Sequence, residues 1–177
     1  MNKYRSHNCS ELTKKNKGEE IFLSGWINKK RDHGNLLFID LRDNYGITQC
    51  IIDKSNSSFK ELEKTQLESV VKINGLVVER SNETINSELQ TGEIEVNINS
   101  FEVLGKCKEL PMPVFSDQEY AEEIRLKYRF LDLRRKKIHE NIILRSKVIS
   151  FIREEMSSLG FLEFQTPILT SSSPEGA

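Results

Sequence analysis

The sequence has few cysteines, and the three it has are widely spaced. Cys9, Cys50 and Cys107 are odd in number and form no C-x-x-C pair or Cys/His cluster. This spacing argues against a disulfide framework and against a structural zinc site. Cys50 lies in the middle of a predicted strand, where a small apolar residue is expected. Thiols in this pattern are typical of a reducing compartment, and we expect a cytoplasmic protein.

Long apolar runs and a net charge of one sign are also lacking. No run approaches the roughly 20 apolar residues of a membrane helix, and the opening MNKYRSHNCSEL has no apolar core of a secretory signal. We therefore expect no association with a membrane. The formal net charge is −1, so any binding of nucleic acid has to come from a local patch rather than from the whole surface.

The chain does contain a series of alternating apolar segments. Period-2 patterns predict five strands, and a short apolar stripe after a run of serines predicts one helix between the third and fourth strands. Polar, lysine-rich residues 1–18 are expected to be a partly ordered lead-in. The predicted strands cover residues 20–29, 36–42, 47–53, 69–80 and 93–104, and the predicted helix covers residues 55–67.

Three strands, a helix and two more strands match the OB-fold, a five-stranded barrel. The alternative is an unrelated small barrel of the SH3 type. The helix between the third and fourth strands argues against that alternative. The sequence therefore predicts a mainly β fold class with an OB-type barrel in the first part of the chain.

An OB-fold binds oligonucleotides across its second and third strands, between two flanking loops. Cations attract phosphate, an exposed aromatic ring stacks on a base, and an amide both donates to and accepts from a base edge. In this chain that edge carries Lys29, Lys30 and Arg31 in a predicted loop 29–35, then Phe38, Gln49 and the polar loop 80–92.

Each of these residues also has an ordinary structural explanation. A run of three cations is more often a solvated loop than a binding site, Phe38 would equally well pack on a neighbouring element, and Gln49 alone is uninformative. Their occurrence together on the edge that an OB-fold uses favours binding of nucleic acid.

The composition changes after the predicted barrel. Residues 106–130 contain two of the four prolines and indicate a linker. A basic stretch with interleaved aromatics, residues 125–137, precedes an amphipathic helix predicted over residues 138–159, with Gly160 at its end. Residues 161–164 are predicted to form a short strand before Pro167. A complete catalytic domain does not fit in these last residues.

Five segments occur in an order that is specific to one family. They are GWINKKRDHG, FIDLRDNYGITQ, TGEIEV, RLKYRFLDLRR and GFLEFQTPILTSSSPEGA. With them the chain resembles the N-terminal part of bacterial-type aspartyl-tRNA synthetases, which are class II enzymes. The resemblance implies an anticodon-binding OB domain at residues 1–105, a hinge at residues 106–130, and the truncated start of a class II α+β catalytic domain at residues 131–177. This last part includes motif 1, the helix and strand of the family's homodimer interface.

The resemblance also implies roles for individual residues in the binding of the tRNA anticodon. The ring of Phe38 is expected to stack on the central anticodon base, Gln49 to hydrogen-bond to that base, and Arg31 to contact the anticodon. Arg80 and Glu95 fall at positions that lie close to the anticodon in the family.

The resemblance implies a two-step reaction for the longer enzyme. Aspartate attacks ATP to give aspartyl-adenylate and pyrophosphate, and the aspartyl group then passes to tRNA, with Mg²⁺ neutralising phosphate charge. Glu175 matches a family residue that contacts the substrate aspartate. The ATP-binding arginines of motifs 2 and 3 do not occur in these 177 residues. No catalytic residue, metal ligand or complete ATP site is therefore expected, and this chain alone should be inactive.

The loop after the first strand bears on which tRNA is accepted. His33 resembles the non-discriminating type of enzyme, which charges the tRNAs of both aspartate and asparagine, although an exposed loop histidine is the simpler interpretation. The second discriminating position falls at Glu83, which differs from either residue expected there. Two other functions stay open: a stand-alone OB protein that binds single strands, and a related synthetase for asparagine or lysine.

Overall fold

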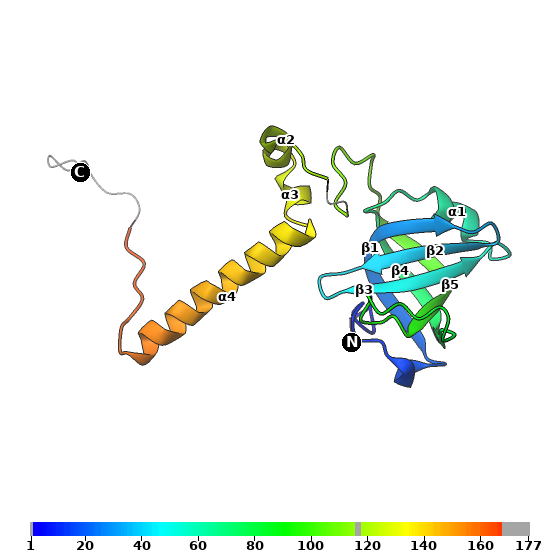
Figure 1. Cartoon of the computed structure of the whole chain (residues 1–177), viewed down its shortest axis with the longest axis horizontal. Helices are drawn as coiled ribbons and strands as arrows, with labels where there is room; N and C mark the ends of the chain where they lie inside the picture. Colours follow the sequence, from blue (N-terminus) through cyan, green and yellow to red (C-terminus); the bar gives the residue numbers. More distant parts are fainter. Residues whose placement is uncertain (1, 116–117, 168–177) are drawn as a thin grey trace. The chain divides into compact units, whose positions relative to one another are not determined.

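The computed structural model describes residues 2–115 and 118–167. The chain divides into two compact units, Met1–Phe115 and Ser116–Ala177, and each is described by itself. Figure 1 shows the strands of the first unit and the helices of the second.

The first unit is a closed barrel with the strand order β1-β2-β3-β5-β4. Neighbouring strands are antiparallel except β3 and β5, which are parallel. Helix α1 lies in the connection between β3 and β4, so the predicted OB-fold is confirmed. The elements are β1 (Glu20–Asp32), β2 (Leu36–Arg42), β3 (Ile47–Asp53), α1 (Phe59–Lys64), β4 (Val70–Glu79) and β5 (Ile94–Gly105).

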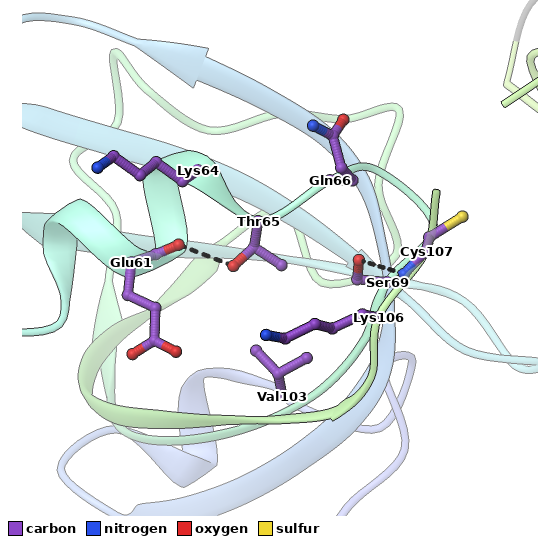
Figure 2. Close-up of a pocket in the computed structure, with 8 residues that line it drawn as sticks. All are labelled: Glu61, Lys64, Thr65, Gln66, Ser69, Val103, Lys106 and Cys107. Atoms are coloured by element: carbon purple, nitrogen blue, oxygen red, sulfur yellow. Dashed lines mark hydrogen bonds between the residues drawn. The ribbon is translucent and has the colours of Figure 1, made fainter. Parts of the chain in front are cut away.

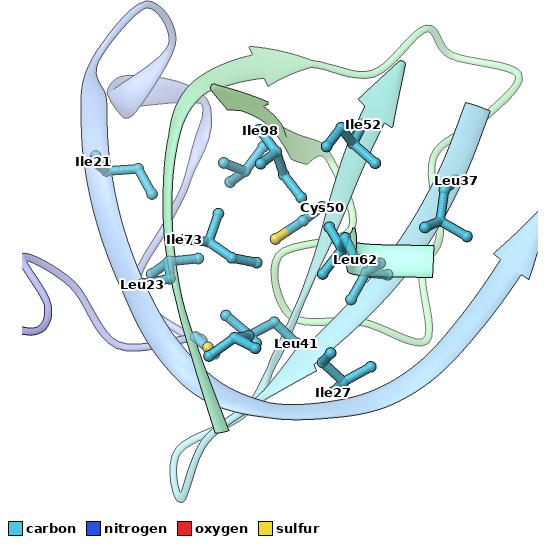
Figure 3. Close-up of a cluster of buried hydrophobic side chains, with 14 of the residues drawn as sticks. Ile21, Leu23, Ile27, Leu37, Leu41, Cys50, Ile52, Leu62, Ile73 and Ile98 are labelled. Carbon is cyan, nitrogen blue, oxygen red and sulfur yellow. The ribbon is translucent and has the colours of Figure 1, made fainter. Parts of the chain in front are cut away.

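Alternation along the strands fills the barrel with apolar side chains (Figure 3). In β2, the predicted inward residues Leu37, Ile39 and Leu41 are all buried. Cys50 is also buried in the core, as its position in β3 predicted. The side chains between these positions point out of the barrel, and this outer face carries the candidate site.

Strand β1 is longer than its sequence pattern predicted. Residues 30–32 were expected in the loop alone, but Lys30 and Arg31 pair with Ile39 and Phe38 of β2. The backbone pairing with β2 outweighs the weak strand preference of these charged residues. The connection is therefore a tight turn, in which Gly34 has a φ of 80°.

The N-terminal segment is also more ordered than predicted. Cys9 and Leu12 are buried in the core at 1% exposure. The backbone N–H of Cys9 donates to Oδ2 of Asp43 at 2.9 Å, and the hydroxyl of Thr48 donates to the carbonyl of Cys9 at 2.8 Å. A short 3₁₀ turn, η1 (Lys14–Asn16), follows and is capped by the side chain of Thr13. The prediction of a partly ordered lead-in was therefore wrong.

The second unit contains α2 (Glu122–Lys127), α3 (Arg129–Asp132) and α4 (Lys136–Ser158). The predicted long helix is confirmed as α4, and Gly160 follows it with a φ of 86°, a conformation that glycine adopts at low cost. No residue of α4 is buried. In the described parts of the chain, no helix is long and apolar enough to cross a membrane.

The predicted strand at residues 161–164 is not formed. Residues 161–167 are exposed and belong to neither a helix nor a strand. A strand needs a neighbour to accept its backbone hydrogen bonds, and among residues 118–167 there is no other strand.

Candidate nucleic-acid interface

A cavity of about 220 Å³ opens on the outer face of the barrel. Its walls come from β1, β2 and β3 and from the connection between β4 and β5. Four residues of this wall were expected at the anticodon site, together with His33. The other two belong to the polar loop 80–92, which was expected at the binding edge as a whole and not residue by residue. The lining residues are Arg31, His33, Phe38, Gln49, Arg80, Thr84 and Asn86.

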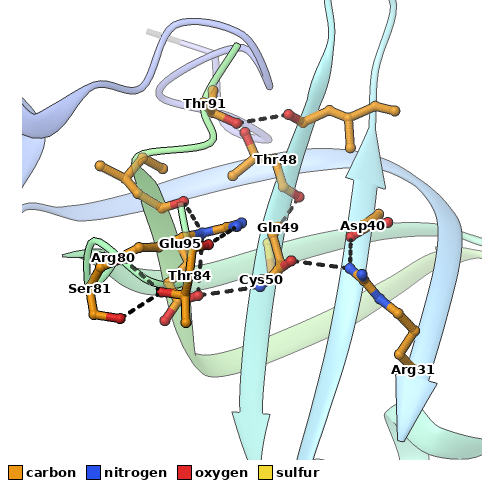
Figure 4. Close-up of polar contacts among 12 residues, drawn as sticks. Arg31, Asp40, Thr48, Gln49, Cys50, Arg80, Ser81, Thr84, Thr91 and Glu95 are labelled. Atoms are coloured by element: carbon orange, nitrogen blue, oxygen red, sulfur yellow. Dashed lines mark hydrogen bonds and ion pairs between the residues drawn. The ribbon is translucent and has the colours of Figure 1, made fainter. Parts of the chain in front are cut away.

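Hydrogen bonds and an ion pair join the polar side chains of this face in a continuous chain (Figure 4). Nη2 of Arg31 donates to Oδ1 of Asp40 at 2.7 Å and to Oε1 of Gln49 at 3.1 Å. Nε2 of Gln49 donates to Oε2 of Glu95 at 3.3 Å. Glu95 in turn lies 3.5 Å from Nε of Arg80. The predicted residue Glu95 thus belongs to the site, although it does not line the cavity.

Burial shifts the pKa values of the two residues at the Arg80 end of this series of hydrogen-bonded side chains. It raises the pKa of Glu95, while Arg80 and the hydrogen bond from Gln49 act in the opposite direction. Burial also lowers the pKa of Arg80, which Glu95 partly offsets. The site therefore holds a cation and a carboxylate that are both shielded from solvent.

Two guanidinium nitrogens of the site are buried and have no hydrogen-bond partner among the described residues. They are Nη2 of Arg80 and Nε of Arg31. Both are donors, and a buried donor without an acceptor costs about 1–3 kcal/mol. Phosphate and base oxygens of RNA are acceptors of this kind, but both nitrogens are closed to solvent here, so a ligand reaches them only if the arginine side chains move.

His33 and Phe38 bring two rings together at the same cavity. Their centroids are 5.1 Å apart and the ring planes meet at 78°, an edge-to-face arrangement. Phe38 is half-buried on the outer face of β2. The prediction that Phe38 lies on the polar face is confirmed, and His33 packs against it rather than standing alone in the loop.

The connection from Arg80 to Gly92 is folded into successive turns. Nη1 of Arg80 donates to the carbonyl of Thr84 at 3.2 Å, and the backbone of Asn86 donates to Gly92 at 3.1 Å. A Cβ at Gly92 would lie 1.7 Å from the Asn86 carbonyl oxygen, so only glycine fits there. These turns bring Thr84 and Asn86 to the cavity, whereas Glu83 is exposed and does not line it.

Lys30 does not belong to the interface. Its Nζ donates to the carbonyls of Glu63 and Thr65, both at 2.6 Å, at the end of α1. Alternation along β1 explains this outcome, because neighbouring residues of a strand point to opposite faces. The expectation that Lys30 forms part of the binding edge was therefore wrong.

A second cavity, of about 230 Å³, lies between the end of α1, the start of β4 and the end of β5 (Figure 2). It is lined by none of the residues predicted to bind RNA. Two hydrogen bonds join its lining residues to one another, from the hydroxyl of Thr65 to the Glu61 carbonyl and from the backbone of Cys107 to Ser69. The cavity beside Phe38 is therefore the stronger candidate site.

Glu175, the residue expected to contact aspartate, lies outside the described residues. Within the described ranges, no group of three or more His, Cys, Asp and Glu side chains is placed to hold a metal ion.

Comparison with known families assigns both parts of the chain. Residues 21–104 match the family described as OB-fold nucleic acid binding domain, and residues 121–177 match tRNA synthetases class II (D, K and N). The chain therefore carries an OB-fold nucleic acid binding domain followed by a segment of a class II tRNA synthetase domain. Over its whole length the chain is similar to aspartate–tRNA(Asp/Asn) ligases.

Two sequence relatives are named aspartate–tRNA(Asp/Asn) ligase. The protein of Pelagibacter ubique is 85% identical over 177 residues, and that of Phenylobacterium zucineum is 56% identical. All of this chain is matched, but it spans only 30% of each relative.

Among solved structures, the asparaginyl-tRNA synthetase of Pyrococcus horikoshii complexed with asparaginyl-adenylate has a TM-score of 0.81 and 26% identity. The match covers 96% of this chain and 38% of that one. The aspartyl-tRNA synthetase of Entamoeba histolytica, with a TM-score of 0.79 and 24% identity, supports the fold.

Proposed function

We propose that residues 1–105 bind the anticodon loop of a tRNA in the cavity beside Phe38. The observation that carries this proposal is that one cavity gathers an aromatic ring, two arginines and an amide from segments far apart in the sequence. Phe38 offers a stacking surface, Gln49 hydrogen-bonds to the central base, and Arg31 and Arg80 contact the anticodon.

We further propose that this chain serves an aspartate–tRNA ligase in which the OB domain selects the tRNA. The longer enzyme joins aspartate to ATP, releases pyrophosphate, and transfers the aspartyl group to tRNA. When bound, Mg²⁺ supplies neutralisation of phosphate charge in the first step. Glu175 contacts the substrate aspartate. The names of the relatives support this activity, and such an enzyme works in the cytoplasm.

The proposed ligase charges the tRNAs of both aspartate and asparagine. The names of the relatives include both tRNAs. His33 packs on Phe38 at the cavity, which suits a role in the strictness of anticodon reading. The role of Glu83, by contrast, is proposed from its position in the sequence alone. A longer enzyme that charges aspartate tRNA and ignores asparagine tRNA contradicts the dual specificity.

We also propose that the longer enzyme is a homodimer and that α4 contributes to its interface. The apolar residues Ile142, Ile149 and Ile152 of α4 are 39–54% exposed. Sedimentation of the longer enzyme tests the proposal, and a strictly monomeric enzyme contradicts it.

The anticodon proposal is tested with the 177-residue chain and two stem-loop RNAs. One RNA carries the anticodon loop of an aspartate tRNA, and the other carries the same loop nucleotides in scrambled order. We expect tighter binding of the anticodon loop, measured by fluorescence anisotropy. Equal affinity for both RNAs contradicts anticodon reading and favours a protein that binds single strands without sequence preference.

A further inference from the structure

Asp40 lies at one end of the polar chain that crosses the site, although it does not line the cavity. Its side chain is 14% exposed, and it stands opposite Gln49 in the pairing of β2 with β3. Nη2 of Arg31 donates to both residues, at 2.7 Å to Asp40 and at 3.1 Å to Gln49. This nitrogen has two hydrogens. Asp40 accepts one of them and thereby directs the other at Gln49.

The amide of Gln49 has only one favourable orientation between its two neighbours. Its Oε1 faces Arg31, which only donates, and its Nε2 faces Glu95, which accepts when ionised. A flipped amide would set its NH₂ group against the guanidinium and its oxygen against the carboxylate. Both hydrogen bonds would then be lost to repulsion. The orientation of Gln49 therefore depends on the charged residues beside it.

We propose that Asp40 is a positioning residue, which fixes the amide of Gln49 through Arg31 and so makes the site distinguish keto bases from amino bases. The inference rests on the proposed function, in which Gln49 contacts a base. Gln49 keeps one Nε2 hydrogen and one lone pair on Oε1 for a ligand. Uracil and guanine present an exocyclic acceptor beside a ring donor, whereas cytosine and adenine present the reverse order. An amide held in one orientation places its own donor and acceptor to match only one of these two orders of donor and acceptor.

Arg31 alone does not hold this geometry. Its side chain is 39% exposed, and a long arginine side chain loses rotamer entropy when it is fixed in one position. The short, charge-assisted contact with Asp40 offsets that loss. Because Asp40 is itself fixed in the middle of β2, it ties the guanidinium to the rigid sheet.

The test measures base discrimination by the 177-residue chain and its Asp40→Asn variant. Four stem-loop RNAs differ only in the central base of the anticodon loop, two carrying keto bases and two amino bases. We expect the wild type to prefer one class and Asp40→Asn to reduce that preference about tenfold or more, since a charge-assisted hydrogen bond is lost. Glu163→Gln, which removes the exposed carboxylate paired with Arg153, should keep the wild-type preference.

A second measurement follows the Gln49 amide in the RNA-free protein. The ¹⁵N relaxation of its side-chain NH₂ should be as restrained as the β3 backbone in the wild type and markedly freer in Asp40→Asn. If Asp40→Asn does not fold, Arg31→Lys takes its place, because a lysine lacks the planar guanidinium fork. An equally rigid amide together with an unchanged base preference in the variant overturns the proposal. A wild type without base preference instead refutes the proposed function, and the amide relaxation then decides the role of Asp40 alone.

Discussion

Lys30 and Thr65 are joined by a hydrogen bond of 2.6 Å from the ammonium group to the backbone carbonyl. The same ammonium donates to the carbonyl of Glu63. The last carbonyls of a helix have no partner within the helix, and α1 has only six residues. Lys30 therefore stabilises the end of α1 from the neighbouring strand. Burial lowers the pKa of Lys30, as expected for a partly buried cation.

Replacement of Lys30 by methionine should lower the stability of the protein without changing its affinity for RNA. The side chain keeps its apolar length, but two carbonyls lose a charged donor. We expect a loss of about 1–3 kcal/mol in the free energy of unfolding, measured by urea denaturation.

Lys29→Met is the matched control, because Lys29 is exposed on the same strand. Its stability should change by no more than about 0.5 kcal/mol. If Lys29 attracts phosphate, its loss lowers RNA affinity and reduces the salt dependence of binding. The assignment of Lys30 fails if Lys30→Met shows this second pattern and keeps wild-type stability.

The N-terminal segment should contribute to the stability of the barrel. Leu12 is buried at 1% exposure, so Leu12→Ala leaves a cavity in the core and should cost about 2–5 kcal/mol. Leu76→Ala is the control, since Leu76 is 38% exposed on β4. Thermal unfolding followed by circular dichroism measures both variants. Equal melting temperatures for the two variants would show that the segment does not anchor the barrel.

Most barrel strands were predictable because apolar residues recur at alternate positions along them. The exception is β3, in which five consecutive residues are buried. The N-terminal segment was not, because Cys9 and Leu12 are isolated among polar residues. The segment is held at Cys9 by hydrogen bonds to Asp43 and Thr48, which lie more than thirty positions further along the chain. The strand predicted at residues 161–164 failed for the opposite reason: its local pattern is typical of a strand, but residues 118–167 contain no partner strand for it.

The site was partly predictable from the same alternation. Phe38 and Gln49 share the outer face of adjacent strands. Asp40, two residues beyond Phe38, is placed on the same face by the same alternation. The ion pair of Arg80 with Glu95 spans the connection between β4 and β5. The family resemblance suggested that both residues lie near the anticodon, but not that they form an ion pair. Thr84 and Asn86 reach the cavity through the turns of that connection, which alternation does not describe.

Removal of the Phe38 ring should weaken RNA binding more than it weakens folding. Base stacking on an aromatic side chain contributes about 1–3 kcal/mol per base. Phe38→Ala should therefore lose affinity for the anticodon stem-loop by a factor of about 5–150, measured by fluorescence anisotropy at constant salt.

Tyr45→Ala is the control for the Phe38 variant. Tyr45 is a 54% exposed aromatic residue that packs on Arg5 and does not line the cavity. Its variant should bind RNA with wild-type affinity. Similar losses for Tyr45→Ala and Phe38→Ala would exclude specific stacking on Phe38.

The ionisation of Glu95 should give the protein a measurable pH dependence. Burial raises the folded-state pKa of Glu95 above its ordinary value of 4.5. Above the folded-state pKa, the ionised carboxylate therefore carries its full cost to stability. That cost decreases as the pH falls through the folded-state pKa towards 4.5, because the folded state binds the proton more tightly than the unfolded state does.

Glu95→Gln isolates this effect, since a neutral amide of nearly the same shape does not titrate. The free energies of unfolding of both proteins are measured by urea denaturation from neutral pH down to about the ordinary pKa of this group, 4.5. Contributions from the other carboxylates largely cancel in the difference. We expect the wild type to gain stability relative to Glu95→Gln as the pH falls. A relative loss would mean that the ion pair with Arg80, rather than burial, dominates and lowers the pKa of Glu95.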